Sequence, residues 1–136
     1  GPQEDLISII TGIQQVKGNI HLNIGEPLIH DEIQAASTCM KNDRYQAIRH
    51  AVDLRVIEGY KLWKTNYISY DMVNHSYKYS DLYSPEDVEA FTEYVEKQLD
   101  KVEKSLCRAD LRDILLRIYG NPVVSREKLM EERKNK

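Results

Sequence analysis

The sequence has few cysteines, no long apolar run and no excess of positive charge, and each absence excludes a class of protein. Its two cysteines, Cys39 and Cys107, lie far apart without zinc-ligand spacing, which favours two reduced thiols over a disulfide. No apolar run approaches the roughly 20 residues of a membrane-spanning helix, and no basic segment precedes an apolar one as in a signal peptide. The net charge of −3 argues against a nucleic-acid-binding protein.

Motifs for catalysis and cofactor binding are also missing. The sequence contains no Gly-x-x-x-x-Gly-Lys phosphate loop, no Gly-x-Ser-x-Gly nucleophile turn and no cluster of histidines and cysteines with zinc-ligand spacing. Its paired carboxylates stand at expected helix starts, where the positive end of the helix dipole accounts for them. These pairs are Glu4 with Asp5, Asp31 with Glu32, and Glu86 with Asp87. The sequence therefore predicts no catalytic residue, no metal site and no cofactor in this chain.

The sequence does contain one clear β-strand pattern. Between Gly18 and Gly25, apolar Ile20, Leu22 and Ile24 alternate with polar residues. This alternation predicts that one row of side chains enters a core while the other faces solvent. Because a lone strand cannot satisfy its own backbone N–H and C=O groups, and no second strand of comparable quality is present, residues 19–25 need a partner.

Helical periodicity accounts for most of the remaining chain. It predicts helices over 4–17 and 31–38, and a longer helix from about residue 42 whose apolar face continues through Tyr60 and Trp63. In this interpretation Gly59 lies inside the helix, where it costs about 1 kcal/mol relative to alanine. One or two further turns carry residues 67–73.

The second half of the chain carries clearer helix boundaries. Ser84 can cap a helix that begins at Pro85, and its apolar positions continue toward Leu106. Another helix over 109–119 is expected to end at Gly120 and Pro122. The almost wholly charged residues 125–136 are expected to form at most a short helix that frays near its end.

Together these patterns predict an α+β, mostly α fold: a bundle of five or six helices with one strand, at about 19–25, that needs a partner. We divide the chain into a helix and strand over 1–28, a helical region over 29–124 and a charged tail over 125–136. The length of 136 residues suits one domain. The opening Gly1-Pro2 does not look like a natural initiation site, which favours a fragment of a longer protein.

Aromatic residues and lysines are interleaved in one stretch, which makes it a candidate membrane or partner face. Its residues are Tyr60, Lys61, Trp63, Lys64, Tyr67 and Tyr70. Tryptophan and tyrosine favour the headgroup depth of a bilayer, and lysines favour anionic lipid. The alternative interpretation is a set of core aromatics beside two solvated lysines, since Tyr60 and Trp63 also continue the helical apolar stripe.

The strand and the turn after it support a family resemblance. Gly18, Ile20, Leu22, Ile24 and Gly25, followed by Glu26, Pro27 and Leu28, resemble the strand that closes the catalytic region of glycerolphosphate and 1-acylglycerol-3-phosphate acyltransferases. The stretches 65–71 and 111–123 look like the helical C-terminal extension of a bacterial subset of that family. The resemblance thus runs in patches from about residue 5 to 124.

The catalytic motif of those acyltransferases, His-x-x-x-x-Asp, has no counterpart here. Of the four histidines, only His21 is followed at that spacing by a carboxylate, Glu26, and it lies on the strand pattern, where an outward-facing side chain is the simpler interpretation. None of the family's catalytic residues can be carried over to this chain. The family's glycine-rich, phosphate-recognising segment is absent as well.

The resemblance implies that this chain is the non-catalytic, structural C-terminal portion of a phospholipid-synthesis-type acyltransferase. Its expected partner is the catalytic region that precedes it, in the cytoplasm and peripherally on the inner face of the membrane. Two alternatives come from other classes. One is an independent helical module that dimerises through the strand edge at Ile20, Leu22 and Ile24. The other is a peripheral module that binds a lipid surface.

Overall fold

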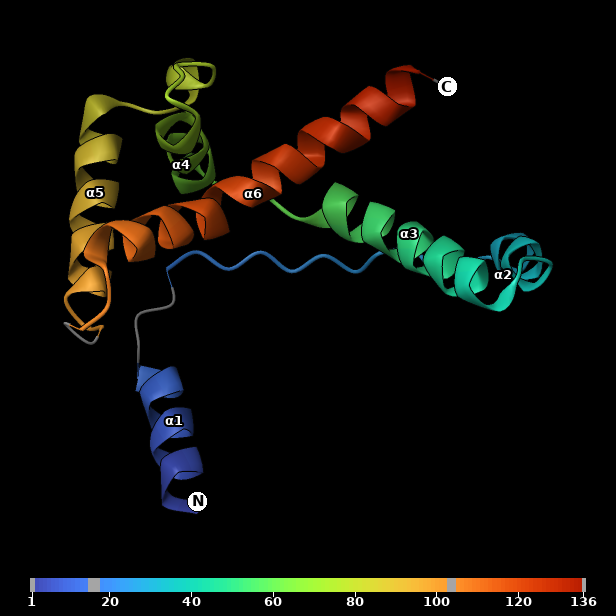
Figure 1. The fold of residues 1–136 in the computed structure, drawn as a ribbon, viewed down its shortest axis with the longest axis horizontal. Helices are drawn as coiled ribbons and strands as arrows, with labels where there is room; N and C mark the ends of the chain where they lie inside the picture. Colours follow the sequence, from blue (N-terminus) through green and yellow to red (C-terminus); the bar gives the residue numbers. More distant parts are fainter. Residues whose placement is uncertain (1, 15–17, 103–104, 136) are drawn as a thin grey trace.

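The computed structural model describes residues 2–14, 18–102 and 105–135 and is mostly helical, as the sequence predicts. These residues form six α-helices, one 3₁₀ turn and no β-strand. In chain order the elements are α1 (Pro2–Gln14), α2 (His30–Ser37), α3 (Lys41–Gly59), α4 (Lys64–Asn74), η1 (Ser80–Leu82), α5 (Pro85–Leu99) and α6 (Arg108–Lys134). Figure 1 shows α6 as the longest element, with α3, α4 and α5 distributed along it.

The core lies where α4 and α5 pack against the first half of α6. Its buried side chains are Ile68 from α4, Phe91, Val95 and Leu99 from α5, and Leu116 from α6. The apolar periodicity of α5 therefore works as predicted as far as Leu99, where the helix ends. The expected continuation is wrong, because Val102 and Leu106 lie beyond the helix and are exposed.

The predicted cap of α5 is confirmed. The Ser84 hydroxyl oxygen accepts a hydrogen bond from the backbone N–H of Asp87 at 3.3 Å, and the Asp87 carboxylate accepts one from the backbone N–H of Ser84 at 2.8 Å. Pro85 occupies the first turn, where its missing N–H leaves no donor unsatisfied. This reciprocal pair satisfies two of the donors that a helix start leaves free.

We expect Ser84→Ala to lower the free energy of unfolding by about 1 kcal/mol, because it removes the side-chain acceptor at this helix start. Urea unfolding followed by circular dichroism measures the change. Ser80→Ala is the matched control: its hydroxyl group donates to the Tyr77 carbonyl in an exposed turn. Equal losses in the two variants would contradict the assigned role of Ser84.

The prediction that a helix ends at Gly120 and Pro122 is wrong, because α6 continues through both residues to Lys134. The helix bends near its middle (Figure 1). The boundary predicted at 124 and 125 therefore falls inside a helix, and the expected frayed tail is helical. Leu129 in this second half is buried. Tertiary packing therefore stabilises a part of the helix for which the sequence pattern predicted no core contact.

Side chains from residues 60–69 form hydrogen bonds with the part of α6 that contains Pro122. The hydroxyl groups of Ser69 and Tyr60 donate to the carbonyl oxygens of Leu116 and Pro122, each at 2.5 Å, and the Asn66 amide donates to the Tyr119 carbonyl at 2.8 Å. Proline interrupts the hydrogen-bond ladder of a helix, and here three carbonyl groups between Leu116 and Pro122 accept hydrogen bonds from outside the helix. These contacts are long-range, which explains why the local sequence did not predict them.

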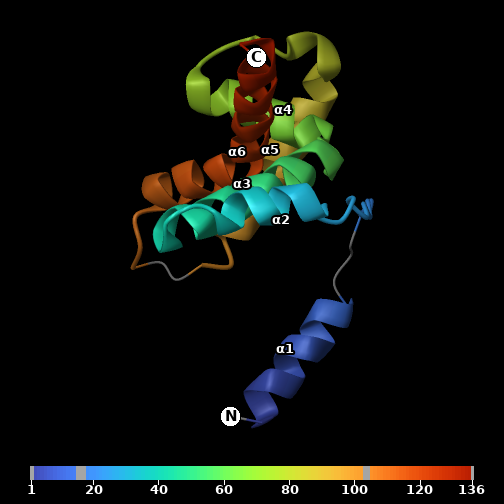
Figure 2. The ribbon, with the colours of Figure 1, turned by 90° about the vertical axis from the view of Figure 1, so that its right-hand side faces the viewer.

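The predicted extent of the helix that starts near residue 42 is also wrong. The helix α3 ends at Gly59, and Tyr60 is extended, so Gly59 is its last residue and not an interior one. Its expected apolar face is largely open, since Tyr45, Val52 and Val56 are exposed. Figure 2 shows α2 and α3 side by side, and Figure 1 shows the pair as an arm that projects from the rest of the helices.

The predicted strand over 19–25 is not formed within the described residues. The segment runs as an extended chain from residue 19 to Ile29 (Figure 1), but no described backbone group pairs with residues 19–25 in a ladder. Nor does its apolar row enter a core of this chain. The helix α1 stands away from the other described helices and packs against none of them (Figures 1 and 2).

Candidate functional site

The most unusual surface of this chain is the outer side of the extended segment. The side chains of Ile20, Leu22 and Ile24 are 80%, 82% and 88% exposed. Because neighbouring side chains of an extended chain point in opposite directions, the polar residues between them face the other way, toward α3. The structure thus places the apolar row in solvent and uses the polar row for internal contacts, which reverses the orientation that the alternating sequence predicted.

The polar row is fixed to the C-terminal end of α3. The Nε2–H group of His21 donates to the carbonyl oxygen of Gly59 at 3.0 Å. The Asn23 side chain occupies the space beside Gly59 so closely that an added Cβ would lie 1.8 Å from its Nδ2. A free helix end has unsatisfied carbonyls, and His21 serves one of them. His21 therefore has a structural contact here.

An arginine from the far end of the chain completes this junction. Arg126 of α6 donates through Nη2 to the carbonyl oxygen of Tyr60 at 2.6 Å and of Glu58 at 3.4 Å. Its guanidinium group also lies 5.0 Å from the centre of the Tyr60 ring, within range of a cation–π contact. Three successive carbonyls at the end of α3 thus receive donors from two other parts of the chain. Sequence reasoning missed Arg126 because its partners lie more than sixty residues away.

The C-terminal end of the extended segment is also tied down. Arg55 of α3 donates to the Pro27 carbonyl at 3.4 Å and forms an ion pair with Glu32 of α2 at 2.7 Å. The hydrogen bond from Arg55, with one from the backbone N–H of Ile29, lowers the pKa of Glu32. A groove of about 650 Å³ lies between residues 21–28 and the second half of α3. The segment is therefore positioned by the helices on one side and uncovered on the other.

The helix that precedes this segment, α1, also carries uncovered apolar residues. Leu6, Ile7, Ile9 and Ile10 are all exposed, although three of them recur at helical spacing as one stripe. In both Figure 1 and Figure 2, α1 extends away from the N-terminal end of the extended segment and from the other helices. Two neighbouring elements thus leave large aliphatic surfaces in water, which is the usual mark of an interaction site.

The six residues predicted as a membrane or partner face are not gathered on one open surface. The Lys61 ammonium lies 4.3 Å from the centre of the Trp63 ring, and Lys64 forms an ion pair with Asp87 at 2.7 Å. Tyr60 bonds α6, as described above, whereas Tyr67 and Tyr70 pack their rings against Tyr79. Lipid binding by these residues stays a prediction.

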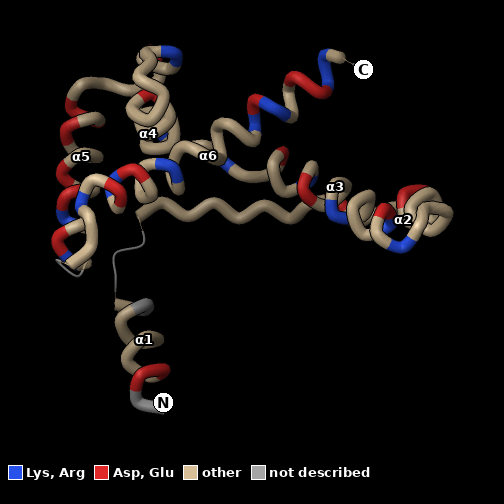
Figure 3. Tube along the Cα trace, viewed as in Figure 1, with Lys and Arg blue, Asp and Glu red and all other residues tan. Residues whose placement is uncertain are grey.

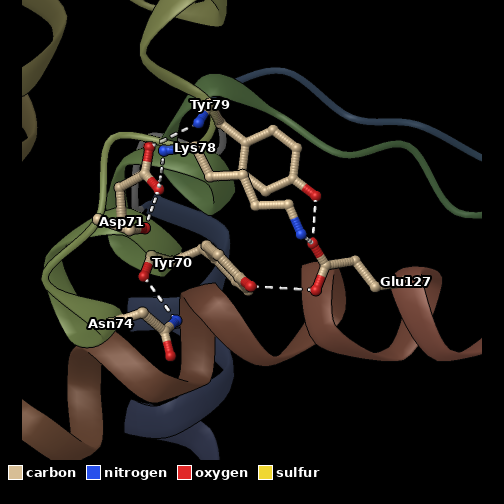
Figure 4. A network of polar contacts seen from close by, with 7 residues as sticks. Tyr70, Asp71, Asn74, Lys78, Tyr79 and Glu127 are labelled. Carbon is tan, nitrogen blue, oxygen red and sulfur yellow. Dashed lines mark hydrogen bonds and ion pairs between the residues drawn. The ribbon is translucent and has the colours of Figure 1, made fainter.

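A polar network that sequence reasoning missed joins α4, the following loop and α6 (Figure 4). Glu127 of α6 accepts hydrogen bonds from the hydroxyl groups of Tyr70, at 3.1 Å, and Tyr79, and it pairs with the Lys78 ammonium. This pairing raises the pKa of Lys78 to about 12, and burial together with Glu127 raises the pKa of Tyr79 to about 12. The network is internally satisfied, which favours a structural role.

Asp71 forms the second half of this network. Its carboxylate is buried and accepts hydrogen bonds from the Ser76 hydroxyl, the Tyr83 hydroxyl and the backbone N–H groups of Lys78 and Tyr79. A signal existed in the sequence: an acidic residue near a helix C-terminus opposes the helix dipole, so its presence needs another explanation. That explanation is the loop over 75–83, which folds around this carboxylate.

The described residues offer no alternative site of a familiar chemical kind. None of their helices combines the length and the apolar character needed to cross a bilayer, and no three of their His, Cys, Asp or Glu side chains gather where a metal ion could bind. Comparisons of the chain with protein-family models, with curated protein sequences and with solved structures find no match.

Proposed function

We propose that this chain is a non-catalytic helical region that contributes residues 19–25 as a strand to the β-sheet of a larger α/β protein. The observation that carries the proposal is the exposure of Ile20, Leu22 and Ile24 in a segment that is already extended and held in place. Burying one such side chain stabilises a protein by about 1.5–3 kcal/mol. Three in a row on one face therefore form an apolar surface that a folded protein gains stability by covering.

The lack of charge on the segment supports a covered strand. Residues 18–25 contain no lysine, arginine, aspartate or glutamate, and Figure 3 shows this part of the trace without a charged position. Strands that remain at the open edge of a sheet usually carry charges or proline that prevent unwanted pairing. A neutral, alternating segment suits a position in which neighbouring strands pair with its backbone.

The larger protein that we propose is a phospholipid-synthesis-type acyltransferase, and this part of the proposal rests on the family resemblance of residues 18–28, 65–71 and 111–123. In it, the preceding catalytic region would supply the His-x-x-x-x-Asp motif and transfer an acyl group to a glycerolphosphate-like acceptor on the inner face of the membrane. The role of the present chain would be to complete the sheet and to hold the helices against it. No residue of this chain is assigned a part in the chemistry.

A second candidate is a homodimer in which two copies of residues 19–25 pair with each other. An antiparallel pair centred on Leu22 would place Ile20 of one copy opposite Ile24 of the other, so the two apolar rows would share one face. The result would be only a two-stranded ribbon, which is marginally stable in water. For this reason we favour a sheet with more strands.

Amide hydrogen exchange of residues 19–25 tests the proposal. We expect slow exchange in the protein encoded by the complete reading frame and fast exchange in the 136-residue chain alone, because only the former supplies partner strands. Fast exchange in both proteins, or a native start codon beside Pro2, would overturn the proposal. If exchange were slow in the 136-residue chain alone, and this chain sedimented as a dimer, the second candidate would be established.

A substitution separates strand pairing from simple loss of stability. Leu22→Asp should leave the stability of the isolated chain within about 0.5 kcal/mol, since Leu22 is already exposed there, and should destabilise the complete protein by about 3 kcal/mol. Ile114→Asp is the matched control, because Ile114 is an exposed aliphatic residue on α6. It should affect the two proteins equally, and the same behaviour in Leu22→Asp would count against a buried strand.

A further inference from the structure

The two uncovered apolar surfaces of this chain belong to consecutive elements. The stripe of Leu6, Ile9 and Ile10 lies on α1, and the row of Ile20, Leu22 and Ile24 lies on the extended segment that follows. The row on the segment faces away from the end of α3, which His21 and Asn23 contact, and α1 packs against no other described helix. If the two elements packed against each other, both apolar surfaces would be buried at once.

The two elements match each other in length. With 13 residues, α1 is about 20 Å long at 1.5 Å per residue, and residues 19–25 span about 23 Å at 3.3 Å per residue. Only a short connection joins them in the sequence. Helix and strand of similar length with a short connection are the parts of a βαβ crossover, in which the helix lies antiparallel to its strand on one face of the sheet.

We infer that α1 lies across the row of Ile20, Leu22 and Ile24 when the extended segment joins a sheet. This inference rests on the proposed function and specifies the kind of sheet that residues 19–25 join. The sheet is parallel next to this strand, because a crossover helix connects parallel strands. The helix α1 covers one face of the strand, and α3 covers the other through His21 and Asn23.

The position of α3 supports this layered arrangement. Parallel sheets occur with helices on both faces, so that neither face meets water. In this chain the end of α3 already contacts the segment through His21 and Asn23, while α1 packs against no other described helix. In a homodimer the two copies of residues 19–25 would be antiparallel, and α1 would then connect no pair of parallel strands. Evidence for a parallel sheet would therefore also argue against the homodimer.

Engineered cysteines test where α1 lies in the protein encoded by the complete reading frame. In an antiparallel arrangement, Leu6 is about 12 Å from the end of α1 at Gln14 and Leu22 is about 10 Å from the start of the strand at residue 19, so the two lie nearly side by side. We would replace both by cysteine in a background of Cys39→Ser and Cys107→Ser. The matched control pairs Leu22→Cys with Ser8→Cys, because Ser8 lies on the opposite face of α1 from Leu6.

Under mild oxidation we expect the pair at 6 and 22 to form a disulfide at least about tenfold faster than the pair at 8 and 22, because a disulfide requires Cα atoms within about 7 Å. Equal rates, or a faster control pair, would overturn the inference. Amide exchange of residues 19–25 in the same variants keeps the two proposals separate. Slow exchange without the disulfide at 6 and 22 would reject the position of α1 and leave the proposed function standing, whereas fast exchange would reject the proposed function.

Discussion

Replacing Asp71 by asparagine is expected to lower the free energy of unfolding by about 3 kcal/mol. The Asp71 side chain accepts hydrogen bonds from two hydroxyl groups and two backbone N–H groups, with the Tyr79 N–H at 2.9 Å and the Lys78 N–H at 3.0 Å. Asparagine has no charge and turns an NH₂ group toward some of these donors. Urea unfolding followed by circular dichroism measures the loss.

Asp81→Asn is the control for this prediction. Asp81 lies in the 3₁₀ turn of the same loop and is exposed, so its substitution should change the stability by less than about 0.5 kcal/mol. If the two variants lost equal stability, the loop would not depend on the Asp71 carboxylate. A second measurement is available in the loop itself: amide exchange of Lys78 and Tyr79 should become faster in Asp71→Asn alone.

The Asp71 carboxylate also makes the free energy of unfolding depend on pH. Burial alone would raise the pKa of Asp71, but the hydrogen bonds from Ser76, Tyr79, Tyr83 and Lys78 outweigh it and lower the pKa below its ordinary value. Because the pKa is lower in the folded than in the unfolded chain, this contribution is complete above the unfolded pKa of about 4. It is lost as the pH falls toward the folded pKa, and Asp71→Asn should show less of this acid-dependent loss.

Gly120→Leu is the second substitution with a large expected effect, again about 3 kcal/mol. A Cβ atom at Gly120 would lie 3.3 Å from both the backbone N and the Cα of Tyr70, and a backbone cannot turn aside as a side chain can. The larger side chain must therefore separate α4 from α6. That separation would also break the 2.5 Å hydrogen bond from the Ser69 hydroxyl to the Leu116 carbonyl.

Leucine is a better helix former than glycine by about 1 kcal/mol, so helix propensity alone predicts that Gly120→Leu stabilises α6. Asn121→Leu isolates this term, because Asn121 is the next residue of the same helix and is exposed. We expect it to leave the stability nearly unchanged or slightly raised in thermal unfolding. A stabilised Gly120→Leu variant would show that α4 and α6 do not need their close approach.

Local signals in the sequence predicted local features of the fold well. Ser84, Pro85 and Asp87 determine the start of α5 through contacts within four residues, and the structure confirms them. The predicted end of α6 was wrong because that end depends on distant residues. Its passage through Pro122 depends on Tyr60 and Asn66, whose contacts span more than fifty residues and leave no periodic trace in the sequence.

The candidate site shows the same division. From its own residues, the chain determined that 19–25 is extended and alternates polar with apolar side chains, because that pattern follows from the geometry of the backbone. Only the tertiary structure decided which row faces outward: the end of α3 offers carbonyl groups and the space beside Gly59, which suit His21 and Asn23 and not an aliphatic side chain. The physical reason is that unsatisfied helix carbonyls need donors, so the polar row turns inward and leaves Ile20, Leu22 and Ile24 for a partner.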